Sequence, residues 1–186
     1  MRRIVTGLFT SLDGVVEADG DWQYPWFDDE LFTVIGSAWG KAGALLLGRR
    51  SFEGYERLRT EHPDSPVLPL FDATPTYVVS TTLAPSSQRE NVTVIGDDLP
   101  RRIASLREEG EGEVLVMGSP SLVRWLVSHR LLDELAMVVL PVVAGPGARL
   151  FDGMPAGPVP LRLIRSRALG SGALDLGYVP EAAPND

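Results

Sequence analysis

Two adjacent arginines, Arg49 and Arg50, are the residues in this sequence best suited to binding an anion. Gly48 precedes them and would let the backbone approach a ligand closely, while guanidinium groups suit phosphate. The apolar run 42–47 predicts a buried strand, and Ser51 is a candidate cap for a following helix. Because the first amides of a helix attract anions, this strand-to-helix turn is a candidate phosphate-binding corner. The alternative is a plain turn with two solvated charges.

A second corner of the same kind follows the apolar segment 113–116. A glycine-containing turn comes first, and then a helix whose cap would be Ser119 and whose first turn would hold Pro120. Ligands of open α/β sheets bind at the carboxyl ends of the strands, so two such corners facing one crevice could hold the phosphates of a dinucleotide. The candidate residues here are Met117, Gly118, Ser119, Pro120 and Ser121.

Three hydroxyl groups end another predicted strand, at Ser80, Thr81 and Thr82, where they could bind phosphate or ribose or could simply cap the turn. The first predicted strand, residues 2–12, carries Leu8 and Thr10 and ends in small polar residues. A ligand could lie against the backbone of such a strand end.

Two carboxylates are candidates for acid-base chemistry. Asp28 begins a predicted amphipathic helix, and Asp13 lies in an Asp-Gly turn. The alternatives are a favourable charge in the first helical turn for Asp28 and a turn residue for Asp13. Residues 15–27, rich in aromatic side chains, either form a lid over a flat ligand or fold back onto the core.

Composition narrows the class of protein. The chain has 186 residues, no cysteine, two histidines and a formal net charge of −8. A single domain over residues 1–180 with a tail at 181–186 is expected, with no disulfide and no metal site. The acidic charge argues against nucleic acid and acidic membranes, and the chain has no apolar run of membrane-spanning length. We expect a cytoplasmic protein.

Hydrophobic patterning predicts an α/β fold. Proline-rich residues 57–75 are expected to be mostly loop, and the chain should close with an antiparallel hairpin. The remaining predicted elements are helices over 28–39 and 99–109, strands at 76–80, 91–95 and 135–143, and hairpin strands at 161–168 and 173–179.

The order and spacing of these motifs resemble the dihydrofolate-reductase-like superfamily, and more closely the reductase domain of the bacterial riboflavin-biosynthesis deaminase-reductase. The resemblance covers nearly the whole chain. The motifs that carry it are Thr10-Ser11-Leu12-Asp13-Gly14, Leu45-Leu46-Leu47-Gly48-Arg49-Arg50-Ser51-Phe52, Tyr77-Val78-Val79-Ser80, Val116-Met117-Gly118 and Leu140-Pro141-Val142-Val143.

This resemblance implies a mixed, mostly parallel eight-stranded sheet flanked by helices, NADPH as hydride donor, and often a homodimer. It assigns the corner at Gly48, Arg49, Arg50 and Ser51 to the cofactor's phosphates, Ser80 and Thr81 to the adenosine 2'-phosphate, and residues 118–121 to the pyrophosphate. Where the family usually has two adjacent glycines, this chain has Gly118-Ser119-Pro120, and proline donates no amide.

The resulting expectation is an NADPH-dependent reductase of a small nitrogen heterocycle or a ribosylamino-pyrimidine-like compound. In it, Leu8 to Thr10 would lie beside the nicotinamide, and Asp28 or Asp13 would help to deliver a proton. One alternative is a non-catalytic protein that binds a nucleotide or another flat ligand on the same fold. Another is a dimeric scaffold with a vestigial site.

Overall fold

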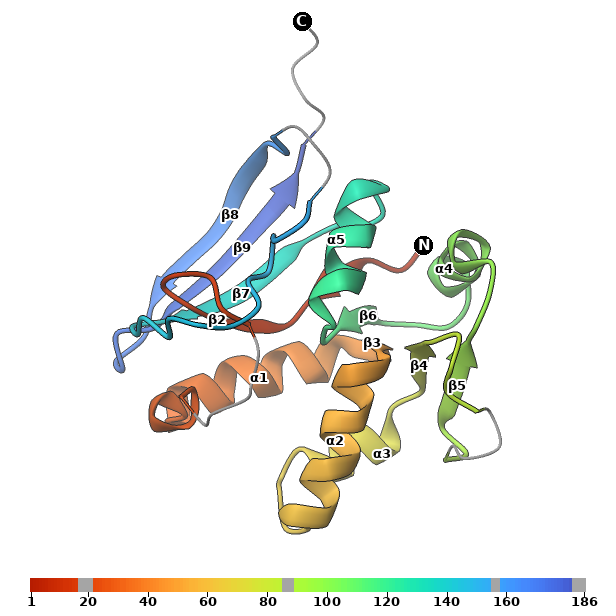
Figure 1. The fold of residues 1–186 in the computed structure, drawn as a ribbon, viewed down its shortest axis with the longest axis horizontal. Coiled ribbons are helices and arrows are strands. Elements are labelled where there is room, and N and C mark those ends of the chain that lie inside the picture. The colour runs from red at the N-terminus through yellow and green to blue at the C-terminus, as the bar shows by residue number, and fades with distance from the viewer. Residues whose placement is uncertain (17–21, 85–88, 155–157, 182–186) are drawn as a thin grey trace, which may run out of the picture.

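A computed structural model describes residues 1–16, 22–84, 89–154 and 158–181, which form two sheets and the helices around them (Figure 1). The strands are β1 (Ile4–Thr6), β2 (Leu8–Ser11), β3 (Ala42–Gly48), β4 (Thr76–Val79), β5 (Val92–Ile95), β6 (Glu113–Val116), β7 (Leu135–Leu140), β8 (Leu161–Ala168) and β9 (Leu174–Pro180). The helices are α1 (Asp29–Lys41), α2 (Arg49–Glu61), α3 (Leu68–Ala73), α4 (Leu99–Glu108), α5 (Pro120–Ser128) and the 3-10 turn η1 (Tyr24–Trp26).

The first sheet is entirely parallel, with strand order β1-β6-β3-β4-β5. Its central strands β3 and β6 are apolar and buried because helices cover both faces of a parallel sheet. The buried side chains of α4 and α5 pack on one face, and those of α1, α2 and α3 pack on the other. The carboxyl ends of β3, β4 and β6 therefore lie at one edge, where their loops can meet.

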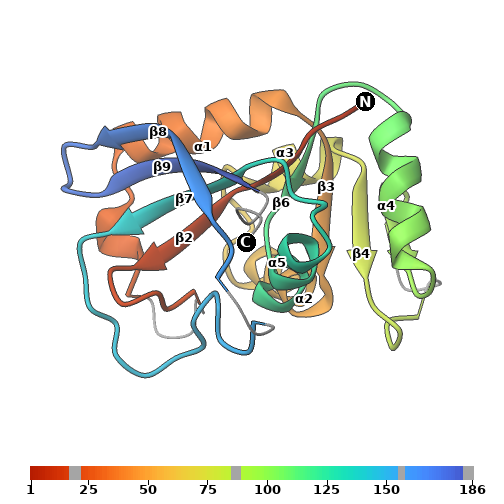
Figure 2. The ribbon, with the colours of Figure 1, turned by 90° about the horizontal axis from the view of Figure 1, so that it is seen from above.

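The second sheet has the order β2-β7-β9-β8, in which only β2 and β7 are parallel. The predicted closing hairpin is confirmed as β8 and β9. Figure 2 shows α1 on one side of this sheet and α5 on the other. The α/β class and the mostly parallel arrangement are confirmed, but the expected eight strands in one sheet are instead nine described strands in two sheets.

The chain passes from one sheet to the other at Gly7. The first strand was expected to run unbroken over residues 2–12, but it changes partner at this glycine. Before it, β1 pairs with β6, and after it, β2 pairs with β7. The Gly7 amide still donates to the Val116 carbonyl at 2.9 Å, while the Thr6 amide already donates to Glu134 at 3.0 Å. One segment of chain therefore joins the two sheets.

Two expectations about helices were wrong. The segment 57–75 is not mostly loop, since α2 continues to Glu61 and α3 follows it. The apolar side chains Leu68 and Phe71 give α3 a buried face that outweighs the neighbouring prolines. Ser51 is not a cap, because α2 begins at Arg49 with Gly48 as its N-cap.

The described part of the aromatic segment folds back onto the core. Trp22, Trp26 and Phe27 pack against the cluster that includes Leu31, and the Phe27 ring lies 5.1 Å from the Phe9 ring. Residues 17–21, which belong to the proposed lid, lie outside the described residues.

The last strand, β9, finishes at Pro180, which is also the last residue of the expected domain. The first residue of the predicted tail, Glu181, is still attached, because its amide donates to the Pro160 carbonyl at 2.9 Å. Residues 182–186 are outside the described ranges. Among the described residues, none of the helices has the length and apolar character needed to cross a membrane.

Candidate functional site

The two strand-glycine-helix corners lie against each other. Strands β3 and β6 are neighbours, so the turns at their carboxyl ends meet, and the Gly48 amide donates to the Gly118 carbonyl at 2.9 Å. Neither α2 nor α5 has a side-chain N-cap hydrogen bond, which leaves first-turn amides available to an anion. The structure thus brings together the two predicted phosphate-binding turns.

Both glycines are required by this contact. A Cβ atom on Gly48 would lie 2.2 Å from Ser119 Oγ, and one on Gly118 would lie 2.7 Å from Ser51 Oγ. Gly118 also has a φ of 96°, which side chains rarely adopt, and its peptide bond to Ser119 is cis. Ser119 itself has a φ of −75°, so the second position of the turn accepts a serine in place of glycine.

Arg49 links this corner to the hydroxyl-bearing end of β4. Its Nη1 atom donates to Thr82 Oγ1 at 2.7 Å, and its Nε atom donates to Glu53 Oε1 at 2.6 Å. Ser80 Oγ accepts from the Thr82 and Leu83 amides at 3.2 and 3.0 Å, and it also lies 3.5 Å from Thr82 Oγ1, where either hydroxyl could donate. The guanidinium group of Arg49 and the hydroxyls of Ser80 and Thr82 therefore lie close together after the end of β4.

Of the three hydroxyl residues expected at this strand end, Thr82 is the one that contacts Arg49, whereas the resemblance had assigned Ser80 and Thr81 to the cofactor. Thr81 is exposed, and no hydrogen bond of its side chain to the described residues is seen. The Ser-Thr-Thr pattern could have suggested either threonine, because the turn geometry after β4 decides which one faces Arg49. Arg50 is exposed and makes no ion pair within the described ranges, so its guanidinium group is available to a ligand.

Leu8 and Thr10 lie on β2, the edge strand of the second sheet. They share one sheet face, since their partners on β7 are Met137 and Val139. Beyond Gly7 the other edge of β2 is no longer paired with β6, which ends at Val116. Backbone groups on that edge lie where the two sheets separate, a common position for ligands in α/β proteins.

Asp13 connects the turn after β2 to the turn after β7. Its carboxylate accepts from the Ser11 hydroxyl at 2.7 Å and from the Ala144 and Gly145 amides at 2.9 and 3.0 Å. These hydrogen bonds, first that of Ser11 and then that of Ala144, lower the pKa of Asp13 to about 2. The group is therefore ionised at neutral pH and is poorly suited to donating a proton.

Asp28 is the N-cap of α1, where its Oδ1 atom accepts from the Leu31 amide at 2.8 Å. In this structure Asp28 therefore stabilises the start of the helix, which was the alternative to a role in acid-base chemistry. Its Oδ2 atom takes no part in that hydrogen bond and remains able to accept one from a ligand. The two candidate carboxylates are held by different segments, Asp13 by the turn at 144–145 and Asp28 by the first turn of α1.

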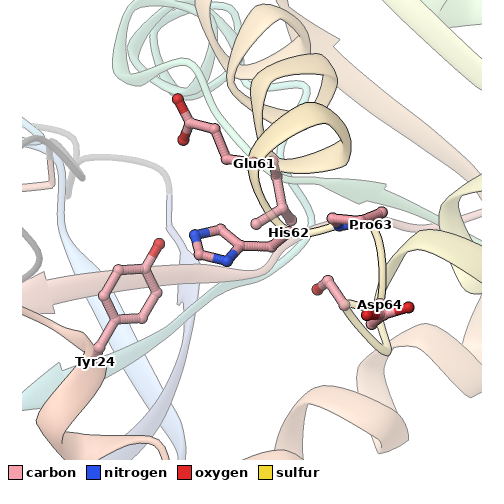
Figure 3. Close-up of a pocket in the computed structure, with 7 residues that line it drawn as sticks. Tyr24, Glu61, His62, Pro63 and Asp64 are labelled. Carbon is pink, nitrogen blue, oxygen red and sulfur yellow. The ribbon is translucent and has the colours of Figure 1, made fainter.

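A cavity of about 540 Å³ lies between η1 and the end of α2 (Figure 3). Figure 3 shows His62 projecting toward Tyr24 across it. The ring centroids of Tyr24 and Phe27 are 6.0 Å apart, and the Phe27 ring in turn contacts that of Phe9 on β2. Aromatic rings therefore connect the cavity to the strand that carries Leu8 and Thr10. The residues that line the cavity are Tyr24, Leu58, Glu61, His62, Pro63, Asp64 and Ser65.

Sequence reasoning missed this cavity because it assigned residues 57–75 mostly to loop and weighed His62 only as a metal ligand or as a structural or exposed residue. The aromatic composition of residues 15–27, which include Tyr24, was the available signal. The described residues contain no group of three or more His, Cys, Asp or Glu side chains that could hold a metal ion.

The fold and the paired corners define a dihydrofolate-reductase-like α/β protein. Dihydrofolate reductase from Enterococcus faecalis, solved with NADP(H), superposes with a TM-score of 0.65 at 16% identity and 97% coverage of both chains. The chain belongs to the RibD C-terminal domain family, whose model matches residues 2–174. The resemblance to the riboflavin-biosynthesis reductase domain is thereby confirmed.

Other relatives agree with this assignment. A putative riboflavin biosynthesis protein from Shewanella sp. PV-4 has a TM-score of 0.79 at 20% identity, with 97% of this chain and 99% of that chain covered. The uncharacterized protein YwjB of Bacillus subtilis is 29% identical over 181 residues, which cover 96% of this chain and 98% of YwjB.

Proposed function

We propose that this protein is an NADPH-dependent reductase of a small nitrogen heterocycle. The observation that carries the proposal is the convergence of two uncapped helix N-termini with Arg49, Arg50 and the hydroxyls of Ser80 and Thr82 at one sheet edge. Membership of the RibD C-terminal domain family and the fold shared with an NADP(H)-complexed dihydrofolate reductase support it.

Each part of the corner suits a different part of the cofactor. The first-turn amides of α2 and α5 would bind the pyrophosphate, although Pro120 contributes none. Arg49, Arg50 and Ser80 would bind the 2'-phosphate of the adenosine, with Arg49 released from Glu53 as it takes up the ligand. Bound NADPH would supply the hydride.

On the substrate side, the free edge of β2 at Leu8 to Thr10 would orient the nicotinamide. The Asp28 Oδ2 atom would accept a hydrogen bond from a ring N–H of the heterocycle while Oδ1 keeps the helix cap. Asp13 would act as a positioning residue for the neighbouring turns, because a carboxyl with a pKa of about 2 stays ionised.

Cofactor titration tests the proposal directly. Purified protein is titrated with NADPH and with NADH while tryptophan fluorescence and energy transfer to the nicotinamide are followed. We expect tighter binding of NADPH, and we expect Arg49→Ala/Arg50→Ala to reduce the preference for NADPH by about 10- to 100-fold, since two guanidinium contacts to the 2'-phosphate are lost.

The matched control is Arg57→Ala/Arg101→Ala, which removes the same two charges from exposed positions on α2 and α4. Its cofactor preference should equal that of the wild type. Equal affinity of the wild type for NADPH and NADH, or an equal change in both double variants, would refute the assigned roles.

The cavity beside Tyr24 would receive the part of the substrate that lies farthest from the nicotinamide. Glu61 and Asp64 line it, and carboxylates at this position would repel a phosphate and favour an uncharged or cationic group. We therefore expect an unphosphorylated heterocycle or ribosylamino-pyrimidine to be reduced faster than its 5'-phosphate. Glu61→Gln/Asp64→Asn should make the two rates of reduction more similar, because it lowers the KM for the phosphorylated compound. If the ratio of the two rates is the same in the variant as in the wild type, the cavity does not select the substrate.

A second candidate, a non-catalytic protein that binds a flat ligand, is favoured by the exposed Tyr24 ring beside the same cavity. It predicts tight binding of a flat heterocycle without any binding of NADPH. The cofactor titration separates the two functions.

A further inference from the structure

Tyr55 on α2 has a hydroxyl group with a weak hydrogen-bond partner. The hydroxyl donates to Met117 Sδ at 3.6 Å, and a thioether sulfur is a weak acceptor. The Tyr55 side chain is half-buried, and its ring stacks on Phe71 of α3 with 5.0 Å between the ring centroids. Because tyrosine hydroxyls removed from water usually have a good partner, this one would gain from exchanging the sulfur for a better acceptor.

Met117 lies where the two sheets separate. Val116 is the last residue of β6, and its carbonyl accepts from the Gly7 amide at 2.9 Å. Met117 follows it, and Gly118 of the phosphate-binding corner comes next. The Tyr55 hydroxyl is therefore held beside the point where this corner meets the free edge of β2, which would orient the nicotinamide.

One face of α2 runs from the phosphate-binding corner to the cavity. The members of this face follow one another three or four residues apart and are Ser51, Tyr55, Leu58 and His62. Ser51 marks the corner, because its Oγ atom would lie 2.7 Å from a Cβ atom on Gly118. Leu58 and His62 line the cavity. Tyr55 therefore lies between the groups assigned to the cofactor and those assigned to the substrate.

The helix α1 approaches the same region from another side. Ile35 packs against the buried cluster on which Tyr55 also packs, and it packs against the cluster that includes Phe9 of β2 as well. Asp28 is the N-cap of the same helix. A heterocycle that reaches from Asp28 to the edge of β2 would therefore pass close to Tyr55.

We propose that the Tyr55 hydroxyl leaves Met117 when substrate binds and donates a hydrogen bond to a ring carbonyl oxygen of the heterocycle. A carbonyl oxygen is a stronger acceptor than a thioether, so this exchange is favourable. Because Asp28 would accept from a ring N–H, the two side chains together select a heterocycle that carries both N–H and C=O groups. This inference rests on the reductase proposed above, and it makes Tyr55 a specificity-determining residue of that enzyme.

Tyr55 would act as a hydrogen-bond donor and not as an acid. Burial raises the pKa of its hydroxyl above the usual value for tyrosine, so the group keeps its proton at neutral pH. A heterocycle with an amino group in place of the carbonyl would turn N–H donors toward this O–H donor. Such a compound would bind without the hydrogen bond.

Two pyrimidines that differ in these groups test the proposal. 6-Aminouracil has two ring carbonyls, and 2,4,6-triaminopyrimidine has amino groups at the same two positions. Ligand-observed NMR titrations at pH 8, with and without NADPH, give the Kd of each. Tyr55→Phe keeps the ring and removes only the hydroxyl. It should raise the Kd of 6-aminouracil by about 3- to 10-fold, the usual loss for one neutral hydrogen bond, and leave that of triaminopyrimidine unchanged.

Two further variants separate contact with the ligand from a role in packing. Met117→Leu removes the thioether and keeps the hydroxyl, so the Kd of 6-aminouracil should stay the same or fall. Tyr178→Phe removes a hydroxyl from β9 of the second sheet and should leave both Kd values unchanged. Circular dichroism and thermal melting show whether each variant is folded.

A packing role for Tyr55 would raise the Kd of both pyrimidines equally in Tyr55→Phe, or would give the same rise in Met117→Leu, and either result would overturn the proposal. Wild-type Kd values in Tyr55→Phe, or a wild type that binds neither pyrimidine, would also overturn it. The reductase itself fails by a different result. A protein that binds 6-aminouracil through Tyr55 but does not bind NADPH would refute the reductase and leave the hydrogen bond from Tyr55 standing.

Discussion

At the residue scale, Gly118 is a position where the backbone and a neighbouring side chain both restrict substitution. Its φ is 96°, and an added Cβ would meet Ser51 Oγ at 2.7 Å. Gly118→Ala should therefore destabilise the protein by about 1–3 kcal/mol and weaken NADPH binding, because the two corners must move apart. Thermal melting and cofactor titration measure both effects.

The matched control is Gly36→Ala on α1, where an added Cβ would meet nothing within 4 Å. It should stabilise the protein by about 0.5–1 kcal/mol, since alanine favours helix, and should leave NADPH binding unchanged. If Gly118→Ala behaves like Gly36→Ala, then contact between the corners does not limit cofactor binding.

Asp28 can be tested for a chemical role because serine is also a good N-cap. Asp28→Ser removes the carboxylate and keeps a side-chain oxygen for the Leu31 amide. With a heterocycle as substrate we expect kcat/KM to fall by at least tenfold while the melting temperature stays within a few degrees. Wild-type kinetics in this variant would assign Asp28 to capping alone.

The individual contacts at the candidate site depended on geometry that the sequence could only partly predict. Gly48 and Arg49 follow from composition and order, because a glycine and arginines after an apolar run are typical of an anion-binding corner. The choice of Thr82 over Thr81 depends on how the chain turns after β4. The ionised state of Asp13 depends on the turn at 144–145, more than 130 positions away in the sequence.

At the element scale, an ion-pair cluster fastens strand β8 to the rest of the sheet. Glu134 and Asp175 are buried and share Arg165, and Arg3 of the first segment also pairs with Glu134 at 2.7 Å. Arg165→Met should destabilise the protein by about 2 kcal/mol, because it leaves buried carboxylates with fewer partners. The exposed pair gives the control: Arg162→Met should cost at most about 1 kcal/mol. Chemical denaturation compares the two, and equal losses would show that the cluster does not hold the strand.

Acid should weaken the fold through two carboxyl groups whose pKa values are lowered. Burial alone would raise the pKa of Glu134, but hydrogen bonds from Arg3 and Arg165 outweigh burial and lower it. Hydrogen bonds lower the pKa of Asp13 from 3.8 to about 2. The stabilisation from each group is fully present above its unfolded pKa and is lost as pH falls through its folded pKa.

The pH dependence of stability measures this contribution. We expect the melting temperature to fall as pH is lowered from 4 toward 2, and Asp13→Asn to show a shallower fall over that interval. A variant with the wild-type slope would mean that Asp13 does not contribute to acid sensitivity.

Element prediction succeeded where periodicity was strong and failed where proline dominated the composition. A helix was expected at 99–109, and α4 is found at Leu99–Glu108, where Ile103 and Leu106 are buried. The helix α3 was missed because it has only six residues, includes Pro69 and depends on tertiary burial of Phe71.

At the scale of the whole molecule, the net charge of −8 should destabilise the compact state through self-repulsion. Screening weakens that repulsion, since the Debye length is about 10 Å at 0.1 M salt. We therefore expect the melting temperature to rise between 0.05 and 0.5 M sodium chloride. Thermal melting at a series of salt concentrations checks this, and a melting temperature that falls with salt would indicate that the surface ion pairs stabilise the fold more than the repulsion destabilises it.

The overall α/β arrangement could be predicted because the order of strand-glycine-helix units dictates a parallel sheet with its loops at one edge. The division into two sheets could not, because it occurs within a segment whose side-chain alternation is regular from end to end. Only the pairing partners of the residues on each side of Gly7 reveal that the strand belongs to two sheets.

Because the strand changes partner at Gly7, the orientation of the site residues on β2 depends on the number of residues between the two sheets. Leu8 and Thr10 face the opposite side of the sheet from Phe9 and Ser11, because side chains alternate along a strand. Insertion of one residue after Gly7 would leave the first sheet in register and exchange these two pairs on β2. We expect homologues that keep the same site to vary in the loops on either side of this segment but to keep the number of residues between the two sheets fixed.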